Sequence, residues 1–497
     1  MPRFVAFVLC VLAPITAAAQ TATYQNRLLG QRAPGMGGAF TGIADDPSAA
    51  YYNPAALSNL STLQLEVGLP VVAIDQLRVF GGLVRGSGSN SDSLVALALP
   101  TMIGAAAGVG PKDGTGNERL TLALSLLIPW QRQVFLRQAL QVTDASAVHI
   151  VQESEQTLML GASLSVRLGI FSIGASLFYI HQNVFWLTSQ TGTASACGVA
   201  SCTVEQAYNH STQLEGWFGA FSPRLGLLLK PTPQWSIGLM ASLSSFRMFG
   251  AGGFKTGGFN ASDAGVLGQQ FYATDHLWFD RPLPWELRVG VGFKLGERFV
   301  FAGDVTFYMP QNFPMLRGVP TGPLIFPADI RRGFVMNGNL GFEYKIRPTI
   351  PLRFGLFTNL SAAPRVQLGP GAQSVLSETA GCADTPCMPW QHSAGITSSV
   401  GAQLWRVQLD FGAIVSYGRG YMQQNEPQGP TRFRWAETDQ IQVQLFIGGN
   451  LGKVLNETAI EIKERIEQRQ RELEEKKQHE RDAASQPLTA PPAPPPP

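Results

Sequence analysis

The feature that most constrains the fold of this chain is a repeated two-residue alternation of apolar with polar or small side chains. It is clearest in the segments 119–128, 157–168, 285–295 and 406–417. In the third segment the apolar positions are Trp285, Leu287, Val289, Val291, Phe293 and Leu295, and the intervening positions are Glu286, Arg288, Gly290, Gly292 and Lys294. Since successive side chains of a β-strand point to opposite faces, this pattern predicts an all-β protein.

Two β architectures fit such alternation. A soluble sandwich packs its apolar faces together and wets its polar faces, whereas a transmembrane barrel turns its apolar face to lipid. Charged residues make up 14% of the chain, below the roughly 25% of an ordinary soluble domain. The other face is rich in Gly, Ala, Ser and Thr, as a narrow lumen requires, and the strands are long, at about 10–14 residues. These features favour a transmembrane antiparallel β-barrel.

Aromatic side chains gather at the ends of the predicted strands, where they suit the interfacial girdles of a membrane barrel. They are Trp130, Tyr179, Trp186, Trp235, Phe246, Trp285, Tyr308, Trp405, Tyr417 and Trp435. After the N-terminus the chain has no apolar run of about 20 residues, which argues against a helical membrane protein. The net charge of +2 argues against nucleic acid as a partner.

The alternation predicts about 14 strands, an even number as in bacterial barrels. They lie near 62–74, 93–103, 118–129, 152–167, 170–183, 209–229, 234–247, 284–296, 298–309, 333–346, 351–361, 393–405, 406–418 and 438–451. Residues 76–84 form either a fifteenth strand or the end of the first. Short turns alternate with long connections, which are predicted to lie outside the cell: 184–208, 248–283, 310–332, 362–392 and 419–437.

Five segments follow along the chain. Residues 1–19, with Arg3, an apolar stretch and the run Ala17-Ala18-Ala19, have the pattern of a secretory signal peptide. Residues 20–60 form a compact segment, 61–452 the barrel, 453–485 a charged helical extension and 486–497 a proline-rich disordered tail. The extension is either a solvated helix or a short coiled coil.

Four cysteines remain after removal of the signal peptide. They form two local pairs, Cys197 with Cys202 and Cys382 with Cys387, each among small residues in a long connection. An oxidising compartment favours one disulfide within each pair. The alternative is a zinc site made by four thiolates, although the spacing within each pair is not typical of zinc. We expect disulfides and no metal.

The segment 30–57, GQRAPGMGGAFTGIADDPSAAYYNPAAL, breaks the alternation. Its glycines permit unusual backbone angles and close packing, and its Asp, Ser, Asn and Pro residues suit turns. A compact segment of this kind before the first strand suits a plug inside the lumen. Its three motifs, Gly37-Gly38-Ala39-Phe40, Ala44-Asp45-Asp46 and Tyr51-Tyr52-Asn53-Pro54-Ala55, resemble the N-terminal signature of the FadL-type outer-membrane transporters of long-chain fatty acids and aromatic hydrocarbons.

This resemblance implies a 14-stranded barrel whose N-terminal hatch closes the lumen. The hatch and gating residues are then Gly35, Gly37, Gly38, Asp45, Asp46, Asn53, Pro54 and Ala55. The function implied is passive, ligand-gated uptake of hydrophobic small molecules, fatty acids or hydrocarbons, through hatch movement and sideways exit. The kinked third strand of the family corresponds to 118–129, which ends at Pro129. We expect a monomer in contact with outer-membrane lipid and lipopolysaccharide, with no cofactor.

Four cations lie on predicted lumen faces: Arg167, Arg288, Lys294 and Arg353. They would either bind a ligand carboxylate or form a structural salt-bridge network with Glu286, Asp304, Glu343 and Asp410. The chain has no GxSxG, HExxH or Walker motif, and its histidines are scattered at positions 149, 181, 210, 276, 392 and 479. We therefore expect no catalytic residues and no enzyme. An alternative function is a secretion shuttle or scaffold that contacts a periplasmic protein or the cell wall through its C-terminal tail.

Overall fold

We describe the protein from a computed structural model. The described residues are 23–25, 27–60, 63–80, 91–97, 100–112, 118–142, 145–197, 202–262, 265–318, 329–364, 390–404, 407–425, 433–452 and 468. The predicted signal peptide, Cys382, Cys387 and, apart from Gln468, the C-terminal segments 453–485 and 486–497 lie outside these residues. The alternative function through the tail is therefore untested by the structure.

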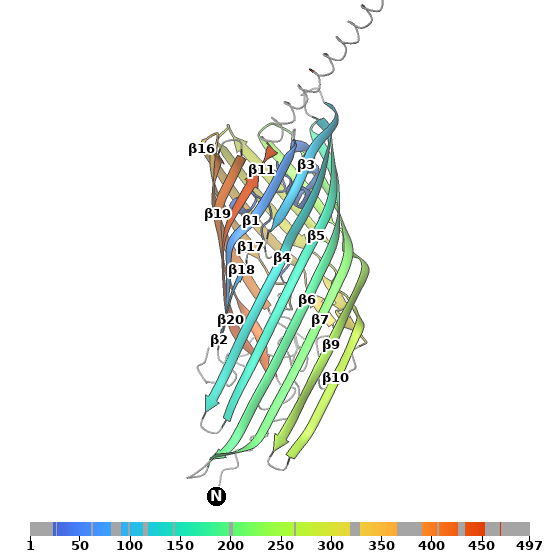
Figure 1. Ribbon diagram of the computed structural model, residues 1–497. Helices are drawn as coiled ribbons and strands as arrows, with labels where there is room; N and C mark the ends of the chain where they lie inside the picture. The colour runs from blue at the N-terminus through green and yellow to red at the C-terminus, as the bar shows by residue number, and fades with distance from the viewer. Residues whose placement is uncertain are drawn as a thin grey trace, which may run out of the picture.

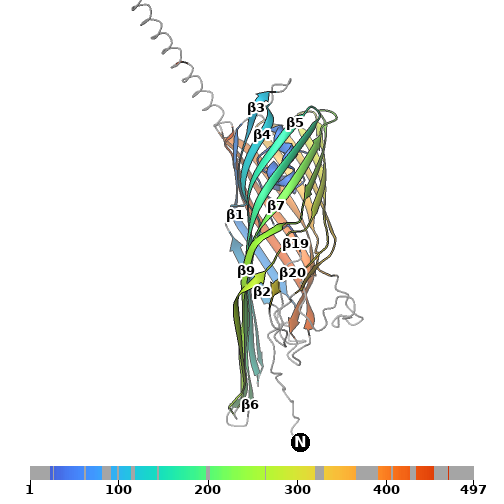
Figure 2. The same cartoon turned by 90° about the vertical axis from the view of Figure 1, so that its right-hand side faces the viewer.

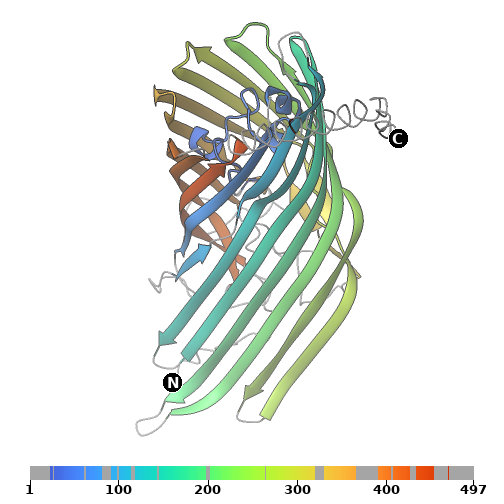
Figure 3. The same cartoon turned by 45° about the horizontal axis from the view of Figure 1, so that its top comes forward.

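The N-terminal segment forms three short helices inside the barrel (Figure 3). They are the 3₁₀-helix η1 (Pro34–Met36), the α-helix α1 (Ala49–Tyr52) and the 3₁₀-helix η2 (Pro54–Asn59). Each is one turn or little more, because Gly37, Asn53 and Leu60 end them in left-handed or extended backbone. We call residues 27–60 the hatch. Its apolar side chains are buried against inward-facing residues of the wall, including Leu127, Met159 and Phe178.

The wall is antiparallel and closed. Its strands are β1 (Gln64–Val79), β2 (Ser91–Leu97), β3 (Met102–Lys112), β4 (Glu118–Val142), β5 (Ala145–Leu168), β6 (Phe171–Cys197), β7 (Cys202–Leu229), β8 (Trp235–Ser242), β9 (Phe246–Ser262), β10 (Gly265–Phe279), β11 (Glu286–Leu295), β12 (Phe299–Tyr308), β14 (Leu316–Arg317), β16 (Val335–Arg347), β17 (Ile350–Asn359), β18 (Trp390–Leu404), β19 (Val407–Asn425) and β20 (Phe433–Asn450). Two further strands, β13 (Gln311–Pro314) and β15 (Asp329–Arg332), pair with each other.

The first strand closes the barrel on the last, with pairs running from Glu66↔Asn450 to Val79↔Thr438. The elements combine into 14 wall strands, since β2 with β3, β8 with β9, β10 with β11 and β12 with β14 are interrupted single strands. This confirms the predicted fold class. Residues up to Val79 belong to the first strand rather than to a fifteenth. Within the described residues no helix has both the length and the apolar character needed to cross a membrane.

The two faces of the wall follow the predicted alternation. In β11 the positions of Glu286, Arg288 and Gly290 face the lumen, while Val291 and Leu295 are exposed on the outside. An antiparallel sheet with one apolar and one polar face satisfies every ladder hydrogen bond within the wall, which is the requirement for crossing lipid. The lipid face therefore follows directly from the period of the sequence.

The predicted long connections 184–208 and 248–283 are wrong as loops. They are extensions of β6, β7, β9 and β10, and together with β4 and β5 they extend well beyond the other strands, toward the bottom of the view (Figure 1, Figure 2). β6 and β7 have 27 and 28 residues, whereas 9–11 tilted residues cross a membrane. Thr, Val, Trp and Tyr residues continue in these segments, and cross-strand pairing on both sides lets them stay in the sheet.

Four of the predicted girdle aromatics are buried instead: Trp130, Trp186, Tyr308 and Trp435. Trp235 and Trp285, by contrast, are exposed on the outer face. For Trp130 the reason is a β-bulge, because the β4–β5 register shifts between Leu127 and Trp130. A bulge inserts an extra residue and reverses which positions face the lumen.

Candidate functional site

A buried carboxylate on β12 binds the middle of the hatch. Asp304 on β12 accepts hydrogen bonds through Oδ2 from the main-chain N–H groups of Phe40 and Thr41, both at 2.9 Å, and from Thr41 Oγ1 at 2.6 Å. Two successive N–H groups that point at one oxygen form a small anion-binding turn. Asp304 therefore fixes the middle of the hatch to the side of the barrel formed by β12.

Asn53 joins three parts of the site. Its Oδ1 accepts from Ala55 N at 3.1 Å and so caps η2, and its Nδ2 donates to Thr41 O at 3.0 Å and to Leu227 O on β7 at 3.1 Å. Pro54 begins η2, where its missing N–H costs no hydrogen bond. The carbonyl of Ala55 accepts from Ser165 Oγ at 2.9 Å. The predicted Asn-Pro-Ala motif is thus a turn bonded to two neighbouring parts of the wall.

We expect Asn53→Ala to loosen the hatch while the barrel still forms. Ala removes the cap and both amide hydrogen bonds, each worth about 1 kcal/mol, but touches no ladder pair. Ion conductance in planar bilayers should rise severalfold, and heat-modifiable migration on gels should be retained. Asn450→Ala, which loses a hydrogen bond to Gln64 on the wall, is the matched control. Unchanged conductance, or loss of the folded barrel, would contradict a gating role for Asn53.

The hatch glycines allow contact between main chains. Gly37, with φ 64°, donates its N–H to Thr397 Oγ1 at 3.0 Å and accepts from Asn339 Nδ2 at 2.6 Å. A Cβ at Gly355 on β17 would lie only 2.1 Å from Gly37 N. Gly35 and Gly38 are also buried here. Small residues on both sides therefore let the hatch lie directly on the wall.

One of the four predicted lumen cations, Arg353, forms ion pairs with two carboxylates inside the barrel. Arg353 binds Glu343 at 2.7 Å and Asp410 at 2.8 Å, and Glu343 also binds Arg32 of the hatch at 2.8 Å. Arg32 pairs in turn with Asp45 at 2.6 Å. Buried charges of both signs at these distances compensate one another's loss of hydration. The predicted gating residue Asp45 is thus linked to the wall through Arg32.

The other three predicted cations lie against the hatch or near the short-turn end of the wall. Arg288 binds Glu286 at 2.7 Å and lies over the ring of Tyr52 at 5.2 Å. Arg167 donates to the carbonyl of Ser58 at the end of η2. Lys294 is exposed near the short-turn end of β11. None of Arg167, Arg288, Lys294 and Arg353 lines the lumen pocket described below.

Asp46, a predicted gating residue, lies outside the membrane-spanning strands. Its Oδ1 accepts from Ser48 N at 2.9 Å, and its Oδ2 has no hydrogen-bond partner among the described residues. Burial, with a further contribution from the charge of Asp45, raises the pKa of Asp46 to about 7. A carboxyl group whose pKa is raised in the folded protein contributes stability that is fully present below its unfolded pKa of about 4 and is lost as the pH rises toward 7.

This shift predicts a pH-dependent hatch. Between pH 5 and pH 8 we expect conductance in planar bilayers to rise severalfold, because Asp46 ionises without a cation of its own. Asp46→Asn should remove most of the dependence. Asp75→Asn, which makes the same change of charge at a wall carboxylate bound to Gln440 and Gln442 instead of the hatch, should keep it. A pH profile that Asp46→Asn leaves intact would show that another group controls the hatch.

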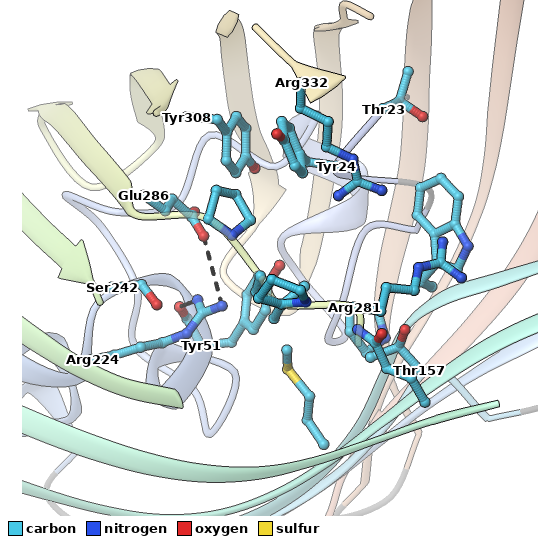
Figure 4. A pocket seen from close by; sticks show the side chains of 17 residues that line it. Thr23, Tyr24, Tyr51, Thr157, Arg224, Ser242, Arg281, Glu286, Tyr308 and Arg332 are labelled. Atoms are coloured by element: carbon cyan, nitrogen blue, oxygen red, sulfur yellow. Dashed lines mark hydrogen bonds and ion pairs between the residues drawn. The ribbon is translucent and has the colours of Figure 1, made fainter. Parts of the chain in front are cut away.

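A pocket lies in the lumen between the hatch and the wall (Figure 4). It has a volume of about 60 Å³. Its lining residues come from the N-terminal segment, the hatch, β4–β8 and the 281–286 segment, among other elements: Thr23, Tyr24, Tyr51, Pro129, Trp130, Thr157, Met159, Gln182, Arg224, Ser242, Arg281, Pro282, Leu283, Pro284, Glu286, Tyr308 and Arg332. The rings of Tyr24 and Tyr308 stack at 4.5 Å and occupy one side. We call this cavity the lumen pocket.

The lumen pocket combines apolar surface with cations. Arg281 binds Glu155 at 2.6 Å, and Arg224 lies 3.7 Å from Glu286. Arg332 lies over the rings of Tyr24, at 5.1 Å, and Phe313, at 5.9 Å, and forms no ion pair with a carboxylate in the described part of the chain. The Nε of Arg332 has no hydrogen-bond partner among the described residues, so the guanidinium retains a donor for an anion. The site therefore combines an apolar and aromatic lining with a cation that could contact an acidic group.

Most residues of the lumen pocket were not predicted from the sequence. Trp130 and Tyr308 were assigned to interfacial girdles, and Tyr24, Arg224, Arg281 and Arg332 were not singled out. Pro129 was predicted as the end of the kinked third strand, and it does line the pocket. The sequence signal that could have indicated the bulge is the pair Pro129-Trp130, because a proline within a strand interrupts the ladder. Within the described residues no group of three His, Cys, Asp or Glu could hold a metal ion.

The main chains of Cys197 and Cys202 lie opposite each other at the end of the β6–β7 hairpin. This register is compatible with the predicted disulfide. Cys382 and Cys387 are outside the described residues.

Comparisons with known proteins agree with this geometry. The sequence profile described as "Outer membrane protein transport protein (OMPP1/FadL/TodX)" matches residues 12–366. A FadL homologue of Pseudomonas aeruginosa is similar in structure, with 11% identity, a TM-score of 0.53 and coverage of 87% of this chain and 100% of the other. The toluene transporter TodX of P. putida has 15% identity and a TM-score of 0.54, with 87% and 99% covered. A search of curated proteins finds no match. At such identities the two structures establish the likeness of the fold.

Proposed function

Since the chain belongs to the outer membrane protein transport family (OMPP1/FadL/TodX), we propose that it carries hydrophobic small molecules across the outer membrane. The family and the structural neighbours are transporters rather than enzymes. A water-filled pore is a poor route for apolar solutes, which need an apolar site that shields them from water. The observation that carries the proposal is the lumen pocket, which touches both the hatch at Tyr51 and the wall at Pro129.

Hatch movement and sideways release are supported by the wall beside the pocket. The second wall strand is interrupted between β2 and β3, and β4 bulges next to it between Leu127 and Trp130. On the C-terminal side of the bulge, β4 contacts β2 through a hydrogen bond from Phe135 N to Ser93 Oγ, at 2.9 Å, rather than through a ladder of main-chain hydrogen bonds. A strand pair without a continuous ladder opens at lower cost than a regular pair. A ligand displaced by the hatch would leave between these strands.

The pocket is lined by aromatic side chains, Trp130 and the stacked Tyr24 and Tyr308, and Arg332 adds a donor for a carboxylate. We therefore propose hydrocarbons and fatty acids as the ligand classes. TodX, one structural neighbour, is described as a toluene transporter. We further propose that residues 1–19 are a signal peptide, that the protein is a monomer in contact with outer-membrane lipid and lipopolysaccharide, and that Cys197 forms a disulfide with Cys202.

The uptake proposal is tested in cells that lack the protein. We expect them to take up radiolabelled hexadecane, toluene or palmitate several times more slowly than wild-type cells, because lipopolysaccharide hinders apolar solutes at the surface. Complementation by the full chain should restore the rate. Uptake of a small sugar through other pores is the control for cell integrity. Equal uptake of all three probes with and without the protein would refute the proposal.

A further inference from the structure

The outer face of the wall carries a groove over β11, β12 and β16–β19. Two neighbouring rows of outward-facing residues cross these strands in register, one from Val291 on β11 to Val415 on β19 and the next from Phe293 to Ala413. Together they line a hollow of about 890 Å³. Sites for small molecules have volumes of roughly 300–1,000 Å³. We call this hollow the outer groove.

Three small residues create the outer groove. Gly303 occupies a place in the first row, and Ser398 and Ala413 are opposite each other in the second. Large side chains stand beside them, since Leu340 is 59% exposed and Phe354 is 54% exposed. A hollow that nothing fills loses dispersion contacts along its lining. The outer groove therefore suits a long, flexible apolar chain that lies across the wall.

The outer groove lies within the membrane, on the side of the short turns. The pair Phe293↔Phe301 is two pairs from the end of the β11–β12 ladder, at Leu295↔Phe299. The other end of the groove, at Ser398↔Ala413, is farther from the β18–β19 turn, as strand tilt requires. β11 and β12 have ten residues each, the length of one membrane crossing. The short turns are opposite the long ends of β4–β7 (Figure 1), so the groove faces the periplasmic leaflet.

Stacked aromatic side chains mark the boundary of that leaflet. The rings of Trp235 and Phe293 lie 4.6 Å apart, and those of Phe299 and Tyr344 lie 4.8 Å apart. Trp and Tyr are enriched where acyl chains meet lipid headgroups. The lower end of the outer groove is therefore at the level of the headgroups.

The two turns next to this boundary are basic. They carry Lys294, Arg298, Lys345 and Arg347, with Glu297 as their one acidic residue. Lys345 N donates to Arg298 O at 2.9 Å, which places the two turns side by side. None of the four cations forms an ion pair in the described part of the chain. Their charge is therefore available to an anion in the membrane surface. We call these four residues the basic turns.

Shape and charge decide which lipid such a surface retains. All lipid tails are apolar, so the hydrophobic effect does not select among them. A tail that fills the outer groove gains packing contacts, and a phosphate at the basic turns gains electrostatic attraction. A zwitterionic phospholipid obtains the first gain and only part of the second. A phospholipid with net negative charge obtains both.

We propose that the outer groove and the basic turns together bind one anionic phospholipid of the periplasmic leaflet. Its acyl chain lies over Gly303, Ser398 and Ala413, and its phosphate contacts Arg298 and Lys345. The bound lipid holds this side of the barrel at a fixed depth in the membrane. The site is on the outer wall and does not depend on the proposed uptake function.

The test measures lipid binding to the purified full-length protein by native mass spectrometry. Palmitoyl-oleoyl phosphatidylglycerol is titrated against the phosphatidylethanolamine with the same chains, and lipid A is the third probe. Ser398→Leu with Ala413→Leu fills the groove from the lipid side. Ala162→Leu with Ala175→Leu is the matched control, because these alanines are exposed on β5 and β6, outside the groove. Heat-modifiable migration on gels checks that each variant forms a barrel.

We expect the wild type to bind one phosphatidylglycerol about fivefold more tightly than phosphatidylethanolamine. Filling the groove should weaken phosphatidylglycerol binding severalfold, and the control pair should bind as the wild type does. Equal affinity for the two phospholipids, or equal affinity of the two leucine variants, would overturn the site. Tighter binding of lipid A would overturn the assignment to the periplasmic leaflet. A dimer without bound lipid would show that a second copy occupies the groove instead.

The charge is tested by Arg298→Gln. Removal of one cation at the membrane surface should weaken phosphatidylglycerol binding about fivefold and leave phosphatidylethanolamine binding nearly unchanged. Arg119→Gln is the matched control, because Arg119 is an exposed arginine near the short-turn end of β4, outside the groove. Equal effects of the two substitutions on phosphatidylglycerol would overturn the role of the basic turns.

A further measurement needs no variant. In nanodiscs, phosphatidylglycerol with a diazirine in its acyl chain should label Phe342 and Ile396 severalfold more than Leu164 and Leu177, which are exposed on β5 and β6. The same diazirine on phosphatidylethanolamine should label the two regions more evenly. Even labelling by both lipids would overturn the site. Uptake of hexadecane, toluene or palmitate has no bearing on this result, so the proposed function and the lipid site fail separately.

Discussion

Asp304→Ala is expected to open the channel. The substitution removes three hydrogen bonds that the carboxylate accepts from Phe40 and Thr41, and it leaves two hatch N–H groups without their partner. Hydrogen bonds to a charged group contribute about 1.5–3 kcal/mol each. Even one such loss shifts the ratio of closed to open hatch about tenfold. We expect the conductance of the variant in planar bilayers to exceed that of the wild type by about tenfold or more.

The control for this variant is Asp75→Ala. Asp75 is also a wall carboxylate, but it binds Gln440 and Gln442 of the neighbouring strand. Its loss should leave the conductance near the wild-type value. Heat-modifiable migration should show that both variants form barrels. If Asp304→Ala remains closed, or if both variants open alike, Asp304 is not the anchor of the hatch.

Arg332→Gln is expected to separate two ligand classes. Gln keeps much of the side-chain volume between Tyr24 and Phe313 but removes the charge. A carboxylate would lose a charge-assisted hydrogen bond, so palmitate uptake should fall about tenfold. Toluene has no acidic group, and its uptake should change little. The measurement is the initial rate of each radiolabelled probe in the same cells.

Arg331→Gln is the matched control for charge. Arg331 is the next residue of β15, is exposed and does not line the lumen pocket. Both uptake rates should remain at the wild-type value. A parallel loss of palmitate and toluene uptake in Arg332→Gln would indicate collapse of the pocket instead of a lost carboxylate contact. Unchanged palmitate uptake would exclude Arg332 as the anion site.

The two-residue period predicted the wall because it depends only on neighbouring residues of the same strand. The low charge content of the chain agreed with a wall that faces lipid. Along 285–295 the period alone separates Glu286 and Arg288 from Val291 and Leu295, and the structure places the two sets on opposite faces. The same holds for the number of wall strands. The motifs of segment 30–57 predicted a hatch through a family resemblance. The extended strands β6, β7, β9 and β10 were missed, because polar residues continue outside the membrane without a lipid face to impose the pattern.

The lumen pocket depended on tertiary structure. Arg281 meets Glu155 across 126 residues of chain, and the rings of Tyr24 and Tyr308 stack although they are far apart in sequence. Barrel closure and strand register determine which of these distant residues meet, and the pattern of neighbouring residues in the sequence does not predict it. Trp130 shows most directly where prediction from sequence ends. Its position in the two-residue period predicts a side chain that faces lipid, but the bulge before it turns the ring into the pocket.

The sequence by itself therefore determined the class of protein, its wall and the existence of a hatch, since hydrophobic period and turn chemistry act between near neighbours. Tertiary structure decided where the wall is interrupted and which side chains meet at those interruptions. A bulge or an inward segment such as 280–285 replaces a few ladder hydrogen bonds by contacts with distant residues. Its stability depends on the assembled barrel and hatch, and so does the site that it forms.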